Sequence, residues 1–309
     1  MGKEEATVVC GTDLGQSGQE AARLARAFAS RLHAKLRLVH AVDFPDLDDL
    51  DGLDPSVRPA AEVLRRRLLA RREEAEARLR ALVDALTNGV EVSGSIVTGR
   101  PWEVLLASAE QEEAAAIVVG PHADAQGLLA KVGERLLGTT AHRVVRHADR
   151  LVLVGTGHTE SAEAALGSKG PLTLVVGVDF EAGGAAALAT ARRLGGDSAR
   201  LVLVHVLQDP FAPGDEPSDW PQLRSQWLVQ LRERLAREAS DAGELRVEPG
   251  DPADALARVG KEVGAHLVVV GAHAGGPLSR ILLGSTAERC LRESPVPVLV
   301  VPPSASTQA

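Results

Sequence analysis

The sequence contains no tyrosine and only seven aromatic residues, three Trp and four Phe, among 309 residues. Aromatic side chains are too few to fill a core, so Val, Leu, Ile and Ala must pack it. Only two cysteines occur, Cys10 and Cys290, which exclude a disulfide framework. Cys10 lies in an apolar run and Cys290 on a predicted helix, and we expect both to be small buried residues in a reducing compartment.

An excess of positive charge is also missing. The chain has 34 Lys and Arg against 42 Asp and Glu, a net charge of −8. Because neither half is basic, electrostatics do not favour a nucleic-acid partner. No apolar run approaches the roughly 20 residues that span a bilayer, and the opening MGKEE shows no signal pattern. We therefore expect a soluble cytoplasmic protein without a membrane partner.

What the chain does contain is an alternation of short apolar runs and helical patterns. The runs at 6–12, 35–42, 90–97, 116–120 and 150–154 are rich in β-branched residues, and helical patterns separate them. Runs without polar alternation are typical of parallel strands covered on both faces. The alternation predicts an α/β fold with a doubly wound parallel sheet of five strands.

This order then begins again, after a small, polar stretch at 156–170 that predicts an interdomain linker. The run at 172–179 repeats the first strand and the run at 200–206 repeats the second. Further landmarks recur in the same order: Asp13 with Asp179, His40 with His205, Gly99 with Gly250, Gly120 with Gly271, His122 with His273, Gly138 with Gly284, and Thr139 with Ser285. We infer an internal duplication with domains at 1–157 and 170–303, and a length of 309 residues suits two domains.

Each copy brings three features to one edge of its predicted sheet, where ligands of parallel sheets bind. In the second copy, Asp179 ends the first strand, Gly271 ends the fourth, and Gly284 begins the returning helix. Free N–H groups at a helix N-terminus attract an anion, and glycines let a phosphate approach the backbone. Ser285 and Thr286 add hydroxyl donors, while the aspartate suits hydrogen bonds from a base or sugar.

Simpler interpretations stand beside this one. Residues 285–288 read as a capping box, so Ser285 can be only a helix cap, and Gly271 can be only a strand-end turn. His122 and His273 are single loop histidines, whereas His40 and His205 lie inside apolar strands and are expected to be satisfied core residues. No paired ligand motif supports a metal site, and no nucleophile motif supports catalysis.

With these residues in place, the chain resembles the universal stress protein family over two consecutive domains. The resemblance rests on VVCGTD ending at Asp13, VVGVD ending at Asp179, and the closing SPVPVLVVP, with further matches after the second and third strands. It implies a Rossmann-like fold of the adenine nucleotide alpha hydrolase type in each domain. The internal repeat and the resemblance thus predict the same architecture.

Members of that family that bind ATP carry Gly, two residues, Gly, nine residues, then Gly and Ser or Thr. The second copy reads Gly271-Ala-His-Ala274, nine residues, then Gly284-Ser285, so only the second glycine departs. Gly275 follows Ala274 and can supply flexibility one residue later. An alanine there is tolerated at negative φ and costly at positive φ.

The first copy departs further from this pattern. It reads Gly120-Pro-His-Ala123, fourteen residues, then Gly138-Thr139, so its loop is five residues longer. Pro121 also removes a backbone donor. We therefore expect the first domain to bind a nucleotide weakly, differently or not at all.

The resemblance implies a site for each domain. The second comprises Gly177, Val178, Asp179 and Val206 near the adenine and ribose, and Gly271, His273, Ala274, Gly275, Gly284, Ser285 and Thr286 near the phosphates. The lesser equivalents in the first are Asp13, Ala41, Gly120, His122, Gly138 and Thr139.

The resemblance also implies a function. The chain would be a tandem universal stress protein that binds ATP, with or without magnesium, or ADP or AMP, mainly in its C-terminal domain. It would act as a stress-response regulator or sensor and not as an enzyme. Two alternatives stay open: an interaction module that binds no nucleotide, and a slow ATP hydrolase using Asp179, His273 and magnesium.

The family's domains pair with one another, so the two halves are expected to form an internal pseudo-dimer. Its contact would join the final strands of the two domains, at 151–154 and 298–301, and would bury two otherwise exposed strand edges. The sequence leaves open whether two chains associate into a homodimer.

Overall fold

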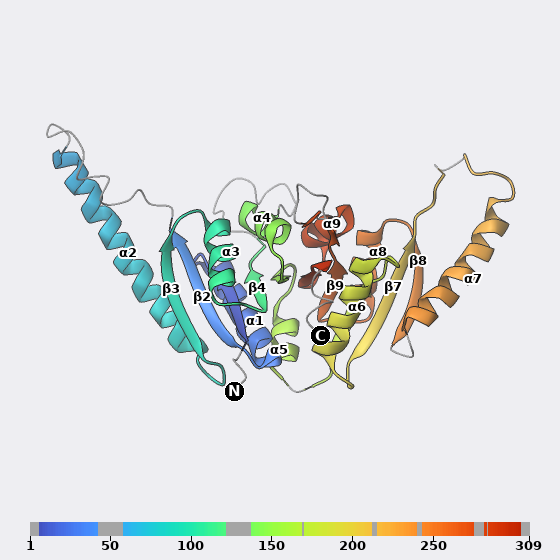
Figure 1. Ribbon diagram of the computed structural model, residues 1–309, viewed down its shortest axis with the longest axis horizontal. Coiled ribbons are helices and arrows are strands. Elements are labelled where there is room, and N and C mark those ends of the chain that lie inside the picture. Colours follow the sequence, from blue (N-terminus) through green and yellow to red (C-terminus); the bar gives the residue numbers. More distant parts are fainter. Residues whose placement is uncertain are drawn as a thin grey trace.

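The computed structural model describes residues 6–42, 58–121, 137–168, 170–211, 215–239, 243–274, 281–282 and 284–303. Within these ranges ten strands form one continuous sheet, in the order β3-β2-β1-β4-β5-β12-β9-β6-β7-β8. Helices cover both faces of this sheet, and the long helices α2 and α7 lie at its two ends (Figure 1). The molecule is therefore an α/β fold in three layers.

The first half alternates strictly between strand and helix. Its elements are β1 (Thr7–Gly11), α1 (Gln16–Leu32), β2 (Lys35–Val42), α2 (Arg58–Leu86), β3 (Val92–Thr98), α3 (Pro101–Gln111), β4 (Ala116–Val119), α4 (Thr139–His147) and β5 (Leu151–Val154). All neighbouring strands of this half pair in parallel, in the spatial order β3-β2-β1-β4-β5. The predicted doubly wound sheet is confirmed, with boundaries within a few residues of those expected.

The second half repeats this plan. Its elements are β6 (Thr173–Gly177), α6 (Ala182–Gly195), β7 (Arg200–Leu207), α7 (Trp220–Ala239), β8 (Glu244–Pro249), α8 (Pro252–Glu262), β9 (Leu267–Gly271), α9 (Ser285–Glu293) and β12 (Val298–Val301). A separate pair of short strands, β10 (His273–Ala274) and β11 (Ile281–Leu282), follows β9. The strand order β12-β9-β6-β7-β8 mirrors that of the first half.

The two halves join where β5 meets β12. These strands pair antiparallel, with Leu153 opposite Leu299 at the centre of the pairing. The predicted edge-to-edge contact between the final strands is therefore confirmed. Each strand covers the exposed edge of the other, which removes two unpaired rows of N–H and C=O groups from solvent.

The stretch at 156–170, predicted from its composition to be an interdomain linker, has regular structure in its centre. It contains helix α5 (Glu160–Gly167), which packs against α1. Ala162 and Leu166, one turn apart, are buried on the same helix face. That apolar stripe consists of only two residues, so composition alone did not reveal it.

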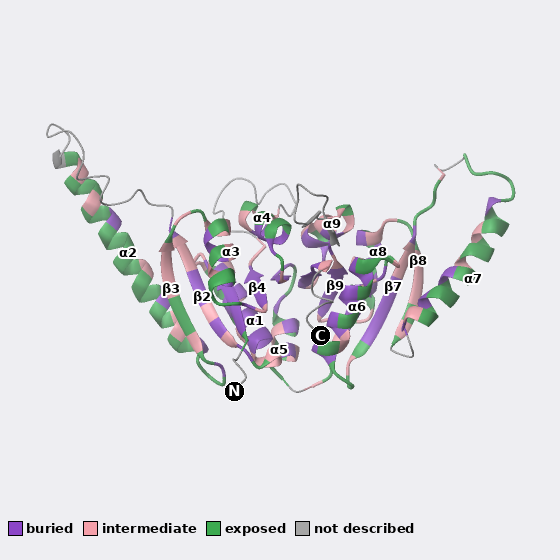
Figure 2. Ribbon diagram, viewed as in Figure 1, coloured by how far each residue is buried: buried purple, intermediate pink, exposed green. Residues whose placement is uncertain are grey.

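Two apolar layers hold the sheet between the helices. One packs the sheet against α1, α2, α5, α6 and α7, and the other packs it against α3, α4, α8 and α9. Both layers run across the seam between the halves, which is the pairing of β5 with β12. Buried residues concentrate in the centre of the molecule, while the ends of α2 and α7 are exposed (Figure 2).

Cys10 and Cys290 are both free and buried, as expected, and burial raises the pKa of both thiols.

No helix in the described part of the chain is long and apolar enough to cross a membrane.

Candidate functional site

An aspartate closes the turn between the first strand and the first helix of each half. Asp13 Oδ1 accepts hydrogen bonds from the backbone N–H groups of Gly15, at 2.9 Å, and Gly18, at 3.0 Å. Asp179 Oδ1 accepts from Glu181, at 2.9 Å, and Gly184, at 3.0 Å. Since the first N–H groups of a helix lack partners within the helix, these bonds fix the start of α1 and α6. Each aspartate thus has a structural role besides the ligand contact predicted from the sequence.

Gly18 and Gly184 are required by the same turn. A Cβ added at Gly18 would lie 2.2 Å from Asp13 Oδ1, and one at Gly184 would lie 2.4 Å from Asp179 Oδ1. Neither position was singled out as functional from the sequence. The signal that could have found them is a glycine five residues after the aspartate in both copies.

The residue after each aspartate has a left-handed backbone. Leu14 has φ 62° and Phe180 has φ 61°, values that residues with a side chain rarely adopt. In the second half the ring of Phe180 stacks on His205, with ring centroids 4.3 Å apart. The guanidinium of Arg234 lies 4.2 Å from the centroid of the Phe180 ring. The turn therefore holds an aromatic side chain over the second strand of its half.

The two strand histidines are satisfied, as expected, and both are half-buried. His40 Nδ1 lies 2.8 Å from the carbonyl oxygen of Thr12, and His205 Nδ1 lies 2.7 Å from that of Val178. A carbonyl only accepts, so Nδ1 carries the proton in both rings. Burial lowers the pKa of His205, and Arg234 lowers it further, against the opposing effects of the Val178 bond and Asp179.

The first half contains a pocket of about 150 Å³ beyond the carboxyl ends of its strands. Its lining includes three residues that the resemblance implied, Asp13, Ala41 and Gly120. Gly138 and Thr139 do not line it, but the next residue on α4 does. The lining residues missed from the sequence include Thr12, Ser17, Gly18, His40 and Thr140.

Helices α4 and α9 start without a capping side chain. Their N-cap residues are Gly138 and Gly284, and neither helix start has a side-chain cap hydrogen bond. The capping box interpretation of residues 285–288 is therefore wrong. Glu288 Oε1 instead lies 4.0 Å from His142 Nε2 on α4, across the junction of the halves. An uncapped helix start leaves N–H groups that attract an anion.

The remaining residues implied by the resemblance lie on the elements expected for them. Gly177 ends β6, Val178 and Asp179 follow it, and Val206 lies on the neighbouring strand β7. Gly271 ends β9, and Ser285 and Thr286 open α9. Of His273 and Ala274 only the backbone is described: Ala274 pairs with Ile281 in the β10–β11 ladder, and alanine adopts this extended backbone without strain. His122 and Gly275 lie outside the described residues.

Packing leaves no room for a side chain at Gly271. A Cβ at this position would lie 2.2 Å from the carbonyl carbon of Gly183 on α6. In the first half, a Cβ at Gly120 would lie 3.0 Å from the Ser17 hydroxyl oxygen. The second half thus brings helix and strand backbones into closer contact than the first.

Over the ranges that the structure describes, no group of three or more His, Cys, Asp or Glu could hold a metal ion.

The two halves share three features: a turn in which an aspartate accepts backbone N–H groups, a histidine bonded through Nδ1, and a helix start without a capping side chain. They define the chain as a duplicated doubly wound α/β protein, with one candidate ligand site at the carboxyl edge of each half.

The model of the universal stress protein family matches residues 6–165 and 172–302. The chain therefore belongs to the universal stress protein family, with two copies of its domain in tandem.

Curated relatives and solved structures agree with this assignment. A universal stress protein of Mycolicibacterium smegmatis is 32% identical over 56% of this chain and 58% of its own length. One of Mycobacterium bovis is 31% identical over 61% and 62%. The chain thus spans about three fifths of the length of the curated relatives it matches.

Two solved structures show the same fold along the whole chain. A functionally unknown protein from Pseudomonas aeruginosa has a TM-score of 0.62 at 17% identity, covering 99% of this chain and 98% of its own. A universal stress protein from Archaeoglobus fulgidus has a TM-score of 0.60 at 19% identity, covering 97% and 100%.

Proposed function

We propose that this protein binds ATP or a related adenine nucleotide, mainly in its C-terminal half, and acts as a stress-response regulator or sensor and not as an enzyme. The observation that carries the proposal is the start of α9. Gly284 is its N-cap without a side-chain bond, and Ser285 and Thr286 supply hydroxyls in the first turn. A phosphate placed there gains N–H donors and the positive end of the helix.

The other end of the same ligand would lie over β6 and β7. Asp179 Oδ1 is engaged by the backbone, so Oδ2 is the oxygen of Asp179 through which we expect the ribose hydroxyls or the base to be held. Val206 supplies backbone groups and an apolar surface on the neighbouring strand. Burial keeps the pKa of His205 low, which avoids an additional positive charge beside the base.

A second binding position is favoured by the pocket of the first half. Asp13, Ala41 and Gly120 line it together with the hydroxyl side chains of Thr12 and Thr140. The polar groups and size of this pocket suit part of a nucleoside. The same ligand class would then occupy both halves, with the longer first loop altering its hold on the phosphates.

Mass spectrometry of nucleotide released from natively purified protein tests the proposal, alongside calorimetry with ATP, ADP and AMP, with and without magnesium. The informative variant is Gly284→Asp, matched by Gly138→Asp. Both N-caps have extended backbone angles, with φ −61°, that aspartate adopts readily, so the helices should gain a cap while a carboxylate opposes the phosphate.

We expect Gly284→Asp to lose nucleotide binding and Gly138→Asp to retain it. The reverse result would move the main site to the first half. No binding of any of the three nucleotides at millimolar concentration would overturn the proposal and favour an interaction module. Turnover of ATP that disappears in Asp179→Ala would instead favour the slow hydrolase.

A further inference from the structure

The two ends of the molecule present exposed apolar side chains on long helices. On α2 these are Val63, Leu64 and Leu69, and on α7 they are Leu223, Trp227 and Val229, each between 41% and 54% exposed. The helices lie at opposite ends of the ten-stranded sheet, and the upper part of α2 extends beyond β3 (Figure 1). These side chains therefore lie away from the site and from the seam.

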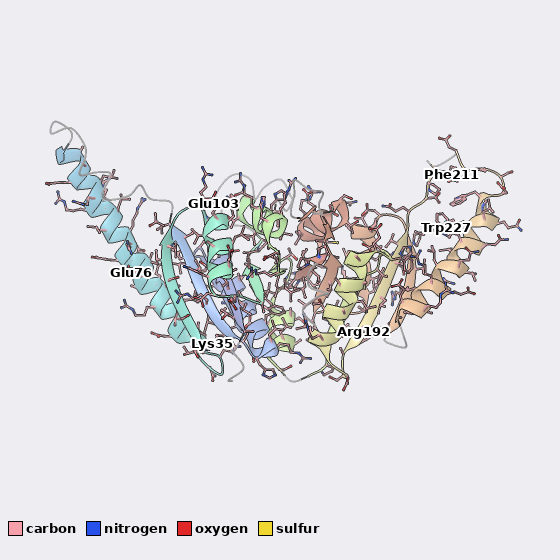
Figure 3. The ribbon with its side chains drawn as sticks, in the orientation of Figure 1. Lys35, Glu76, Glu103, Arg192, Phe211 and Trp227 are labelled. Atoms are coloured by element: carbon pink, nitrogen blue, oxygen red, sulfur yellow. The ribbon has the colours of Figure 1, made fainter. Side chains whose placement is uncertain are left out.

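The end formed by α7 concentrates aromatic side chains in a chain that has few. Phe211 and Trp220 have ring centroids 5.0 Å apart, and Trp220 and Trp227 have centroids 6.1 Å apart, both edge to face. Trp227 and Leu223 are one turn apart, so they share a helix face. Figure 3 shows Phe211 and Trp227 together at this end of the molecule. Exposed Trp beside apolar neighbours is typical of the energetic centre of a protein interface.

The same end is acidic. Asp215, Glu216 and Asp219 are exposed just before α7. The ion pairs found among the described residues do not involve any of the three. We call Asp215, Glu216, Asp219, Leu223 and Trp227 the acidic end.

The end formed by α2 has the opposite charge. Arg66, Arg67 and Arg71 are exposed, and none takes part in an ion pair found in the described ranges. Leu64, Arg67 and Arg71 follow one another at helical spacing, so an exposed leucine and two arginines form one stripe. We call Leu64, Arg66, Arg67 and Arg71 the basic end. Within one chain the basic and acidic ends cannot meet, because the whole sheet separates them.

We propose that the basic end of one copy docks on the acidic end of a second copy of this chain. When a two-fold axis relates the copies, the basic end of each chain contacts the acidic end of the other, so the assembly closes as a dimer. The arginines and carboxylates set the pairing, while Leu64, Leu223 and Trp227 supply the apolar contact. This contact does not use the edges of β5 and β12, which pair within the chain.

Charge reversal tests the pairing, with mass measured by sedimentation and light scattering at low salt. Arg67→Glu with Arg71→Glu makes both ends of a chain acidic, and Glu216→Lys with Asp219→Lys makes both ends basic. Each double variant alone should be monomeric at concentrations where the wild type is dimeric. An equimolar mixture of the two should form a heterodimer, since each acidic end then meets a basic one. The control is Arg80→Glu, an exposed charge on the part of α2 beside β3, which should leave the dimer intact.

A second variant probes the apolar contact. Trp227→Ala should weaken dimerisation by about tenfold or more, and raised salt should weaken the wild-type dimer as well. Circular dichroism confirms that each variant is folded. The proposal is overturned if the wild type remains monomeric throughout the micromolar range, if the charge-reversed variants still dimerise alone, or if their mixture stays monomeric.

Discussion

Gly271 at the end of β9 lies directly against Gly183 on α6. A Cβ at Gly271 would lie 2.2 Å from both the carbonyl carbon and the carbonyl oxygen of Gly183. The obstacle is backbone, which cannot rotate away as a side chain can. The glycine at the head of the family motif in this half therefore serves helix-to-strand packing, whatever ligand lies beyond it.

We expect Gly271→Ala to lower the free energy of unfolding by about 3 kcal/mol, the upper range for overpacking a core. Urea denaturation followed by circular dichroism measures it. The matched control is Gly120→Ala, where the added Cβ meets the hydroxyl of Ser17 at 3.0 Å. That side chain can rotate, so the loss should stay within about 1 kcal/mol. Equal losses in the two variants would contradict the packing explanation.

Asp179 combines a structural and a proposed binding role, which two substitutions separate. Asp179→Ala removes the acceptor for the N–H groups of Glu181 and Gly184 and should cost about 1 to 2 kcal/mol of stability. Asp179→Asn keeps an acceptor oxygen and should cost less than about 0.5 kcal/mol. Because it replaces the second oxygen with a donor, Asp179→Asn should still weaken nucleotide binding.

Asp13 provides the control for this pair. Asp13→Ala removes the equivalent bonds to Gly15 and Gly18 and should destabilise the protein as much as Asp179→Ala does. Under the proposed function it should leave the main nucleotide site intact, as calorimetry can show. If Asp179→Asn binds nucleotide like the wild type, the aspartate is a helix-start residue and nothing more.

The sequence predicted the fold well because each half is built from local patterns. Continuous apolar runs mark strands buried on both faces, and the recurrence of Asp13 as Asp179 marks the end of the first strand in both halves. The pairing of Leu151–Val154 with Val298–Val301 was predictable because two apolar edges require cover. The helix α5 was not predictable from composition, since its buried stripe consists of Ala162 and Leu166 alone.

The site was less readable because its key contacts are between backbone and side chain. The Gly184 N–H donates to Asp179 Oδ1, and only the recurrence of a glycine five residues after the aspartate points to this bond in the sequence. The contact of Gly271 with the backbone of Gly183 depends on a three-dimensional distance that no short motif encodes. Glu288 stands at the right spacing for a capping box, yet it points to His142 on the other half. Local spacing cannot anticipate a partner that tertiary structure brings from 146 residues away.

His266 should make stability depend on pH. Its Nδ1 accepts the backbone N–H of Thr173 at 3.0 Å, which requires a neutral ring, and burial lowers its pKa. Burial likewise lowers the pKa of His205. Below the unfolded-state pKa of about 6.5 the unfolded chain binds more protons, so this stability is present above that pH and is lost as pH falls.

We therefore expect the urea concentration at the unfolding midpoint to decrease when the pH is lowered from about 7.5 to about 5.5. His266→Gln should be less stable at the higher pH and should lose less on acidification, and adding His205→Gln should flatten the profile further. The midpoints at matched pH values give the slopes directly. Parallel profiles for wild type and both variants would show that these histidines do not carry the dependence.

Arg31 joins the halves on one face of the sheet. It lies on α1, and its Nε and Nη2 each donate at 2.9 Å, to the carbonyl oxygens of Leu194 and Gly195 at the end of α6. The last carbonyls of a helix lack partners within the helix, and a cation there also meets the negative end of the helix dipole. Arg31→Ala should thus lower the free energy of unfolding by about 2 kcal/mol. Arg31→Lys should restore only part of this stability, because an ammonium lacks the planar fork of a guanidinium.

Arg26→Ala is the control on the same helix. Arg26 Nη1 donates at 3.3 Å to the carbonyl oxygen of Asn88 within the first half, and the loss of stability in this variant should stay within about 0.5 kcal/mol. Urea midpoints that fall equally for Arg31→Ala and Arg26→Ala would mean that the contact across the halves adds nothing to the stability of the tandem sheet.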